Sequence, residues 1–249
     1  MGSRADPPTI AIARRFAGPA DSGNGGYTAG MLAGHLLGPN ASGAGARIRL
    51  RQPPPLDVAM LVERATDDVG IRVLLGGAVI ADAAPAVLER EPVESVTVAD
   101  ACEAETAYAG LTSHPFPACF SCGPQRSPGD GLRLRPGRVG GGRTACTWTP
   151  DGSLAGENAT QVRDEFVWAA LDCPGGWTAD LEGRPMVLGT MSAAIDAHAE
   201  VGERHIIMGL LLGHEGRKTF TASTLHDSDG RVVARAEHTW IAVDPHAFQ

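Results

Sequence analysis

Three short stretches carry residues whose types and spacing can do chemistry. Asn24-Gly25-Gly26 has the composition of a capped helix start, where free backbone N–H groups can stabilise a developing oxyanion. Asp172 lies in the last predicted turn of a second helix, where a carboxylate faces the negative end of the helix dipole. Cys119 and Cys122 have the spacing of half a zinc site. The ordinary alternatives are a plain helix start, a solvated acid and free thiols.

A structural zinc ion needs about four ligands, usually in two close pairs. Cys119 and Cys122 form such a pair, but Cys146 and Cys173 stand alone in the sequence, and His114 is followed by a Pro-Phe-Pro run. A metal site therefore fails on ligand count. We expect no metal, and we expect the pair to be small, partly buried thiols, although the sequence leaves metal binding by this pair open.

The glycine-rich start at residue 24 also invites a dinucleotide-binding interpretation. That fingerprint requires a third glycine where Thr28 stands, together with a parallel-sheet repeat. Neither is present in the sequence pattern, so this function class is set aside.

Overall composition excludes two further function classes. The chain has 249 residues and a formal net charge of −8, which disfavours nucleic-acid binding because phosphate neutralisation requires a basic face. No run of about 18 or more apolar residues would span a membrane. The first 16 residues show no signal-peptide pattern, so we expect a cytoplasmic protein without nucleic-acid or membrane partners.

The elements that must position these residues occur in the same order twice. In the first half a short strand candidate precedes a helix that starts near Asn24 and is stopped by Gly38-Pro39, and strand candidates follow. These cover 46–52, 57–65, 70–83 and 94–101. One side of this helix carries very small residues, including Gly30 and Gly34, and we expect it to lie close to a sheet.

The second half repeats this order. Strand-like runs precede a helix within 161–181, which Pro174 should end or kink just beyond Asp172. Four strands follow, with hairpin turns at 213–216 and 227–230. The strand-like runs cover 131–137, 143–150, 185–199, 204–213, 217–227 and 231–243. One helix followed by an antiparallel meander predicts an α+β fold in which a sheet wraps around the helix.

Three motifs resemble those of a known superfamily. The stretch CFSCGPQRSPGDGLRL from Cys119 resembles the opening of many hotdog-fold thioesterases, and VWAALDCPGG resembles their central helix with its acid. GNGGYTAGMLA resembles the Gly-Gly helix start of another type of hotdog repeat. The chain therefore resembles a double-hotdog acyl-CoA thioesterase, loosely similar to the acyl-CoA thioesterase II group. The resemblance implies two tandem hotdog folds, an N-terminal repeat over 1–108 and a C-terminal repeat over 109–249.

The chain departs from this family pattern in a complementary way. The first helix has Ala33 where the family acid would fall, whereas the second helix has Asp172 there. The second helix has Arg-Asp-Glu at 163–165 where the glycines would be. Family active sites combine the helix start of one hotdog with the acid of the other. The resemblance thus implies one composite site per chain.

The expected catalytic residues follow from that composite site. Gly25 and Gly26 would supply oxyanion contacts beside Asn24, and Asp172 would act either as general base or as nucleophile. By resemblance, His238 falls near a polar active-site position of thioesterase II enzymes. Spacing places Glu165, Trp168 and Asp172 on one helical face. The residues expected to bind substrate are Tyr27, Trp168 and Arg217, the last through the phosphates of coenzyme A.

The expected function is hydrolysis of acyl-CoA or acyl-carrier thioesters. No cofactor is expected beyond coenzyme A as part of the substrate, and a homodimer is the default assembly. The alternatives are a non-catalytic acyl-CoA or lipid binder on the same fold and a hotdog dehydratase or hydratase. The identity of the acyl chain, its carrier and the role of Asp172 as base or nucleophile stay open.

Overall fold

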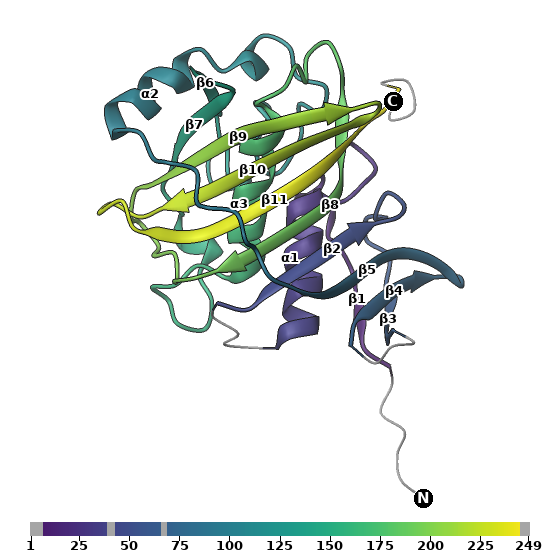
Figure 1. Cartoon of the computed structure of the whole chain (residues 1–249). Coiled ribbons are helices and arrows are strands. Elements are labelled where there is room, and N and C mark those ends of the chain that lie inside the picture. Colours follow the sequence, from purple (N-terminus) through teal and green to yellow (C-terminus); the bar gives the residue numbers. More distant parts are fainter. Residues whose placement is uncertain (1–6, 39–42, 66–68, 245–249) are drawn as a thin grey trace, which may run out of the picture.

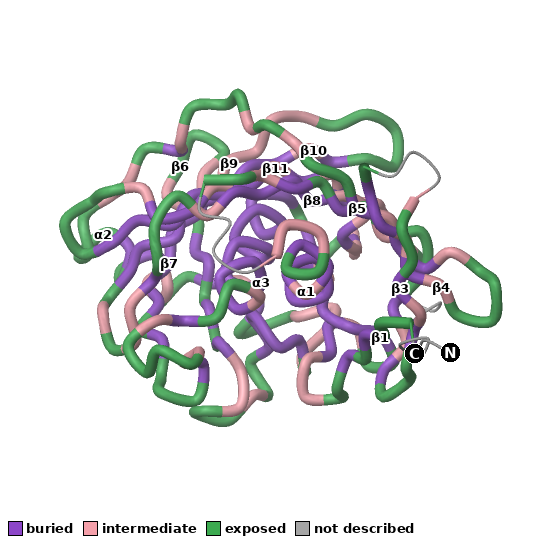
Figure 2. Tube along the Cα trace, turned by 90° about the horizontal axis from the view of Figure 1, so that it is seen from below, coloured by how far each residue is buried: buried purple, intermediate pink, exposed green. Residues whose placement is uncertain are grey.

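The computed structural model describes residues 7–38, 43–65 and 69–244. One antiparallel sheet curves around two long neighbouring helices, α1 (Gly25–Leu37) and α3 (Asp164–Gly176), as Figure 1 shows. Figure 2 shows both helices end-on beneath the sheet and mostly buried, with the C-terminal end of α1 exposed. Within the described part of the chain, no helix combines the length and apolar character needed to cross a membrane. This arrangement is the α+β hotdog architecture expected from the sequence.

The described residues form eleven strands of one sheet, in the order β1-β3-β4-β5-β2-β8-β11-β10-β9-β7-β6. Strands β1 to β5 belong to the first half and β6 to β11 to the second. Their bounds in the first half are Thr9–Ile10, Gly45–Leu50, Met60–Arg64, Ile71–Leu75 and Ala78–Ala86. Those in the second half are Gly137–Gly140, Arg143–Trp148, Met186–Ile195, His205–Glu215, Lys218–His226 and Val232–Ala242.

The strand order shows the repeat directly. The strands that follow α1 stand in the order β3-β4-β5-β2 across the sheet, and those that follow α3 stand in the order β9-β10-β11-β8. In both halves this is the second, third, fourth and first strand after the helix. A strand before each helix, β1 or β7, pairs with the second strand of its own repeat. The two first strands, β2 and β8, pair antiparallel at the centre. The chain is therefore a double hotdog with one continuous sheet.

Helix α1 begins and ends where the sequence predicts. Asn24 caps it, because its Oδ1 accepts a hydrogen bond from Tyr27 N at 2.8 Å. Gly38 ends it with a φ of 77°, a left-handed conformation that favours glycine. Pro39 lies outside the described residues. The hairpin turn at 227–230 is confirmed by the antiparallel pair β10–β11. The β9–β10 hairpin is also present, but its turn lies at 216–217 rather than 213–216, because Gly213, His214 and Glu215 still pair with β10.

Two predicted strands are wrong. Residues 94–101 include no strand, and Val98–Thr106 form α2 instead, because Thr97 and Asp100 make a capping box at its start. Residues 131–136 form no strand either. Leu132 and Leu134 donate their backbone N–H groups to Phe120 and Ser121 of a neighbouring loop rather than to a strand.

Helix α3 continues beyond the predicted stop. It runs through Pro174 to Gly176, so Asp172 lies one turn before its end rather than at a break. Gly175 faces Thr221 and His238 of the sheet, and a Cβ there would lie 2.7 Å from Thr221 Oγ1. The absence of a side chain at this position lets the last turn of the helix pack against the sheet.

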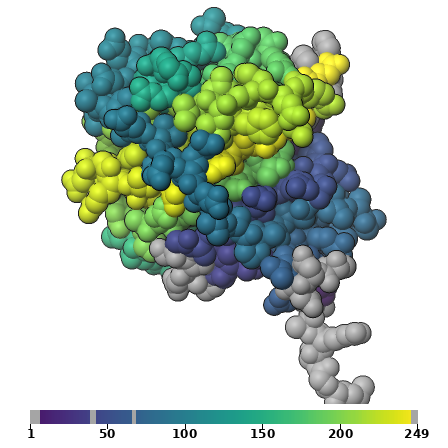
Figure 3. Space-filling view, in the orientation of Figure 1, coloured from purple at the N-terminus to yellow at the C-terminus, as the bar shows by residue number. Residues whose placement is uncertain are grey.

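The segment between β5 and α2 covers the outer face of the second repeat's sheet, as Figures 1 and 3 show. Val93 N donates to Thr224 Oγ1 at 2.9 Å, and Val93 O lies 2.9 Å from His226 Nε2. Val93 thereby joins a small second core with Met208 and Ala222. The proposed repeat boundary between 108 and 109 stays a prediction, since α2 itself packs against β6 and β7 of the second repeat.

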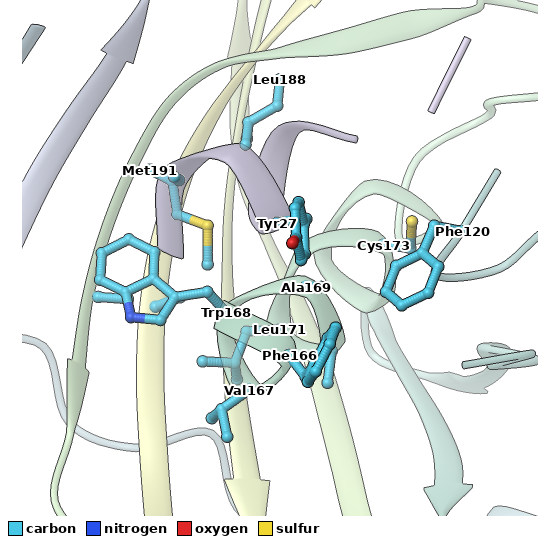
Figure 4. Packing of buried hydrophobic residues seen from close by; sticks show 14 of the residues in the cluster. Tyr27, Phe120, Phe166, Val167, Trp168, Ala169, Leu171, Cys173, Leu188 and Met191 are labelled. Carbon is cyan, nitrogen blue, oxygen red and sulfur yellow. The ribbon is translucent and has the colours of Figure 1, made fainter. Parts of the chain in front are cut away.

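The main core lies between the sheet and the two helices. Tyr27 stacks on Phe16 with ring centroids 4.0 Å apart, and Phe120 and Phe166 complete an aromatic group around them. Figure 4 shows Tyr27, Phe120 and Phe166 in this group, with Trp168 and Met191 farther along the core. These side chains fix the two helices against each other.

Candidate active site

The two central helices cross with backbone in direct contact. A Cβ on Gly26 would lie 2.6 Å from Asp172 Cβ and 2.7 Å from Trp168 O, and one on Gly30 would lie 2.6 Å from Glu165 Cα. Only glycine permits this approach. The small side of α1 was expected to face a sheet, but Gly30 faces α3 and Gly34 is exposed. The predicted common face of Glu165, Trp168 and Asp172 thus meets α1.

This crossing places Asp172 at the start of α1. Asp172 Oδ2 accepts hydrogen bonds from Gly26 N at 3.0 Å and from Asn24 Nδ2 at 3.1 Å. Asp172 Oδ1 is buried and has no partner among the described residues. The side chain is 3% exposed. One carboxylate oxygen is therefore held in place, and the other stays available as an acceptor.

Burial dominates the protonation of this carboxyl group. Desolvation raises the pKa of Asp172 to about 7, and the neighbouring Cys119 adds to this effect, while the hydrogen bonds from Gly26 and Asn24 oppose it. Near neutral pH the group is therefore close to half ionised, which is the range in which a side chain exchanges protons most effectively.

A pocket of about 360 Å³ opens beside this carboxyl group. Asn24, Gly25 and Asp172 lie in its wall, and most of the remaining lining is apolar. The larger apolar side chains that line it include Leu50, Phe116, Trp177, Met186, Leu188 and Trp240. Two exposed arginines, Arg51 and Arg217, also contribute to the lining. An apolar pocket with a few convergent polar groups is typical of a small-molecule site.

The two predicted oxyanion donors, the N–H groups of Gly25 and Gly26, differ in what they contact. Gly26 N–H is used on Asp172 and does not line the pocket, so the oxyanion contact expected of it is wrong in this arrangement. Gly25 lines the pocket, and its N–H donates to no acceptor among the described residues. Gly25 is therefore the backbone donor that a ligand can reach at the positive end of the α1 dipole.

His238 lies outside the pocket, on the other side of the last turn of α3. Its Nδ1 is 3.1 Å from Thr221 Oγ1, which also accepts a hydrogen bond from Trp240 Nε1 at 3.0 Å. Burial lowers the pKa of His238 to about 3. The structure does not bring this histidine to the site.

The three predicted substrate contacts have different outcomes. Arg217 lines the pocket, with its Nε donating to Ala242 O at 3.3 Å. Tyr27 is buried in the aromatic group and Trp168 lies between the helices, and neither lines the pocket. Large aromatic side chains are typical both of ligand sites and of the protein interior, and the structure places these two in the interior.

A second, much smaller pocket lies at the opposite end of the helix pair. Its volume is about 30 Å³, and Ala33, Asp164 and Trp168 contribute to its lining. It combines the start of α3 with the C-terminal half of α1, as the larger pocket combines the start of α1 with the C-terminal half of α3. The two pockets thus occupy equivalent places in the two repeats.

Sequence reasoning missed a group of three thiols in the wall of the larger pocket. The sulfur atoms of Cys119, Cys122 and Cys173 all lie within 4.8 Å of one another, and all three side chains are buried. The argument that Cys173 stands alone is therefore wrong. Cys119 and Cys122 were expected to be partly buried, and both are buried, with exposed fractions of 5% and 3%. The available signal was the position of Cys173 directly after Asp172.

The thiols of Cys122 and Cys173 are hydrogen-bonding neighbours of the Cys119 thiol. These hydrogen bonds hold the pKa of the Cys119 thiol well below its usual value, against the effect of burial. Asn24 Nδ2, the same group that contacts Asp172, also lies 3.6 Å from Cys119 Sγ. The thiol group and the carboxyl group therefore share one polar neighbour.

Comparisons with known proteins agree on the fold. No protein-family model matches the sequence, and no curated protein matches it. Among solved structures, a candidate thioesterase from Novosphingobium aromaticivorans matches with a TM-score of 0.64 and 12% identity over 95% of each chain. A conserved hotdog-fold protein from Alicyclobacillus acidocaldarius matches with a TM-score of 0.61 and 12% identity, over 95% of this chain and 93% of that one.

A third structure comes from the same group that the sequence motifs resemble. The TesB protein of Mycobacterium avium subsp. paratuberculosis matches with a TM-score of 0.60 and 10% identity, over 95% of this chain and 92% of that one. At such identities the likeness concerns the fold. Together with the strand order, it shows that this chain has the double hotdog fold found in thioesterase-type proteins.

Proposed function

We propose that the protein hydrolyses acyl thioesters, such as those of coenzyme A or an acyl carrier, at one composite site between the repeats. The observation that carries this proposal is the contact between the start of α1 and Asp172 in the wall of an apolar pocket. The fold supports it, since two structures of similar fold are named as candidate thioesterases.

The carbonyl group of the thioester binds at the start of α1. Gly25 N–H donates to the carbonyl oxygen, and the positive end of the helix dipole stabilises the negative charge that develops there. The absence of a side chain on Gly25 leaves its N–H accessible, because a Cβ would lie 2.7 Å from Leu188 Cβ and crowd this corner of the pocket.

Asp172 activates the attacking water. Oδ2 is held by Gly26 and Asn24, so Oδ1 is the oxygen that accepts a proton from water. The resulting hydroxide forms a bond to the carbonyl carbon, and the carbon–sulfur bond then breaks. The proton held by Asp172 passes to the leaving thiolate, which restores the carboxylate and releases a carboxylic acid and a thiol.

The pKa of about 7 supports the general-base role, because a base that titrates near the working pH both accepts and returns the proton readily. Arg217 supports a substrate whose distal end carries phosphate, since an exposed guanidinium group on the pocket lining can contact it. The apolar lining accommodates the acyl chain.

The test is thiol release from a panel of acyl-CoA thioesters by the wild type, by Asp172→Asn and by Asp164→Asn. Asp164 is the matched control, because it is an exposed acid on the same helix. Loss of a general base costs about a hundredfold or more in rate. We expect Asp172→Asn to show that loss and Asp164→Asn to keep wild-type turnover.

Two results contradict the proposal. A folded Asp172→Asn protein with wild-type turnover would remove Asp172 from the mechanism. Tight binding of acyl-CoA thioesters by the wild type, without turnover on any member of the panel, would identify a non-catalytic binder instead. Single-turnover hydrolysis in ¹⁸O-labelled water identifies a nucleophile when the label enters Asp172, because a general base never acquires an oxygen atom from water.

A further inference from the structure

We propose that Cys119, Cys122 and Cys173 form a binding site for a thiophilic metal ion of the zinc type, in the wall of the larger pocket. The three sulfur atoms converge from two parts of the chain, the loop before β6 and the C-terminal turn of α3. The site is independent of the proposed hydrolysis, because its occupancy can be measured without any turnover.

The sulfur positions fit a tetrahedral ion. Zinc–sulfur bonds of about 2.3 Å place two sulfurs of one tetrahedron about 3.8 Å apart. Cys119 Sγ and Cys173 Sγ are 3.8 Å apart, and Cys122 Sγ lies within 4.8 Å of both. Movements of less than an ångström therefore bring all three sulfurs to bonding distance of one ion.

N–H groups from three different side chains point at these sulfurs. Trp177 Nε1 donates to Cys122 Sγ at 3.4 Å, and Asn24 Nδ2 donates to Cys119 Sγ at 3.6 Å. His114 Nε2 is 3.3 Å from Cys122 Sγ. A buried sulfur surrounded by N–H donors is suited to the thiolate form, which is the form that binds metal.

The tautomer of His114 determines whether this residue can be a metal ligand. Phe116 N donates to His114 Nδ1 at 2.9 Å, so Nδ1 is unprotonated and the proton of the neutral ring sits on Nε2. Nε2–H therefore donates to Cys122 Sγ, and His114 acts as an outer partner that positions a ligand rather than as a ligand itself. The protein supplies three sulfur ligands.

Three ligands leave one position of a tetrahedral ion open. All three cysteines line the pocket, so a water molecule or a pocket ligand can occupy that position. The ion would tie the loop that carries Cys119 and Cys122 to the turn of α3 directly after Asp172. Metal binding would thereby hold one wall of the proposed site in place.

The test uses the whole protein, reduced and stripped of metal with a chelator, and then titrated separately with Zn²⁺ and with Co²⁺. Bound zinc is measured by elemental analysis, and cobalt binding by the thiolate-to-metal charge-transfer absorption together with the visible bands of tetrahedral Co²⁺. Cys122→Ser and Cys173→Ser each remove a proposed ligand, and Cys146→Ser is the matched control, a buried cysteine outside the cluster.

We expect about one ion per chain in the wild type and in Cys146→Ser, with tetrahedral thiolate spectra for cobalt. Cys122→Ser and Cys173→Ser should bind at least about tenfold more weakly. Reduced wild-type protein without a thiolate–cobalt absorption would overturn the site, whether or not the variants fold. Equal zinc affinity in the wild type and Cys173→Ser would also overturn it.

Discussion

The two ends of the helix pair differ although the repeats place them equivalently. At the start of α1 the glycines meet Asp172 beside a pocket of about 360 Å³. At the start of α3 no side chain caps the helix, and the equivalent pocket has a volume of about 30 Å³. Figure 1 shows the two helices side by side under the shared sheet.

The two helices carry different residues at two aligned positions, and these explain the difference between the two ends. When the first residues of α1 and α3 are aligned, Asp172 corresponds to Ala33 and Trp168 corresponds to Ala29. Trp168 lines the smaller pocket with its large ring, whereas the corresponding residue of α1, Ala29, carries only a methyl group. Ala33 supplies no carboxylate there. The two repeats thus share a fold, but one end of the helix pair has a carboxylate, a glycine helix start and a large pocket, whereas the other end is mostly filled by side chains.

The largest effect on the helix crossing is expected from Gly26→Ala. The added methyl group would meet Asp172 Cβ and Trp168 O, and backbone cannot yield as a flexible side chain does. We expect a loss of about 1–3 kcal/mol in the free energy of unfolding, as for other overpacked sites. Chemical denaturation measures it, and thiol release should fall with it because Asp172 is displaced.

Gly34→Ala is the control on the same helix. Its Cβ meets nothing within 4 Å, so the higher helix propensity of alanine should stabilise the protein by up to about 1 kcal/mol. Equal effects of the two substitutions would contradict the close crossing of α1 and α3 at Gly26.

A smaller effect, on the pH dependence of stability, is expected from His238, which lies beneath α3 in the second repeat only. Its folded pKa of about 3 lies below the unfolded value of 6.5. The unfolded state therefore binds the proton first, and the stability that the neutral ring contributes is present above pH 6.5 and lost as the pH falls toward 3. The loss is roughly 1 kcal/mol between pH 6.5 and 5.5.

Denaturation of the wild type and His238→Gln at several pH values measures this contribution. The difference between the two should shrink as the pH falls below 6.5. His35→Gln, at an exposed position on α1, should follow the wild type at every pH. A constant difference between wild type and His238→Gln would show that His238 is not held neutral.

The element order and the helix start were predictable because they depend on local chemistry. Asn24 caps α1 through its own neighbours, and Gly38 ends it through its backbone conformation. The error at 94–101 also had a local signal, since Thr97 and Asp100 have capping-box spacing. The continuation of α3 through Pro174 had none, because the packing of Gly175 and Gly176 against the sheet decides it.

The composite carboxyl site was predictable only through the complementary pattern of the two helices. That pattern identified Asp172 and the start of α1, but it did not show that Gly26 N–H is used on the carboxylate. The thiol group had only an indirect signal in the sequence, the position of Cys173 directly after Asp172, because Cys173 lies 54 residues from Cys119 and only the fold brings them together. His238 and Trp168 do not line the larger pocket, because His238 on β11 packs against the last turn of α3 and Trp168 lines only the smaller pocket. Chemical type alone does not reveal either placement.

The most direct test of the composite site is a crystal structure with a ketone analogue of an acyl-CoA thioester, in which CH₂ replaces the sulfur. We predict one analogue per chain in the larger pocket, with its carbonyl oxygen within hydrogen-bond distance of Gly25 N and its carbonyl carbon facing Asp172 Oδ1. An analogue bound at the end of the helix pair near Ala33 and Asp164, or one whose carbonyl points away from Gly25, would contradict this account.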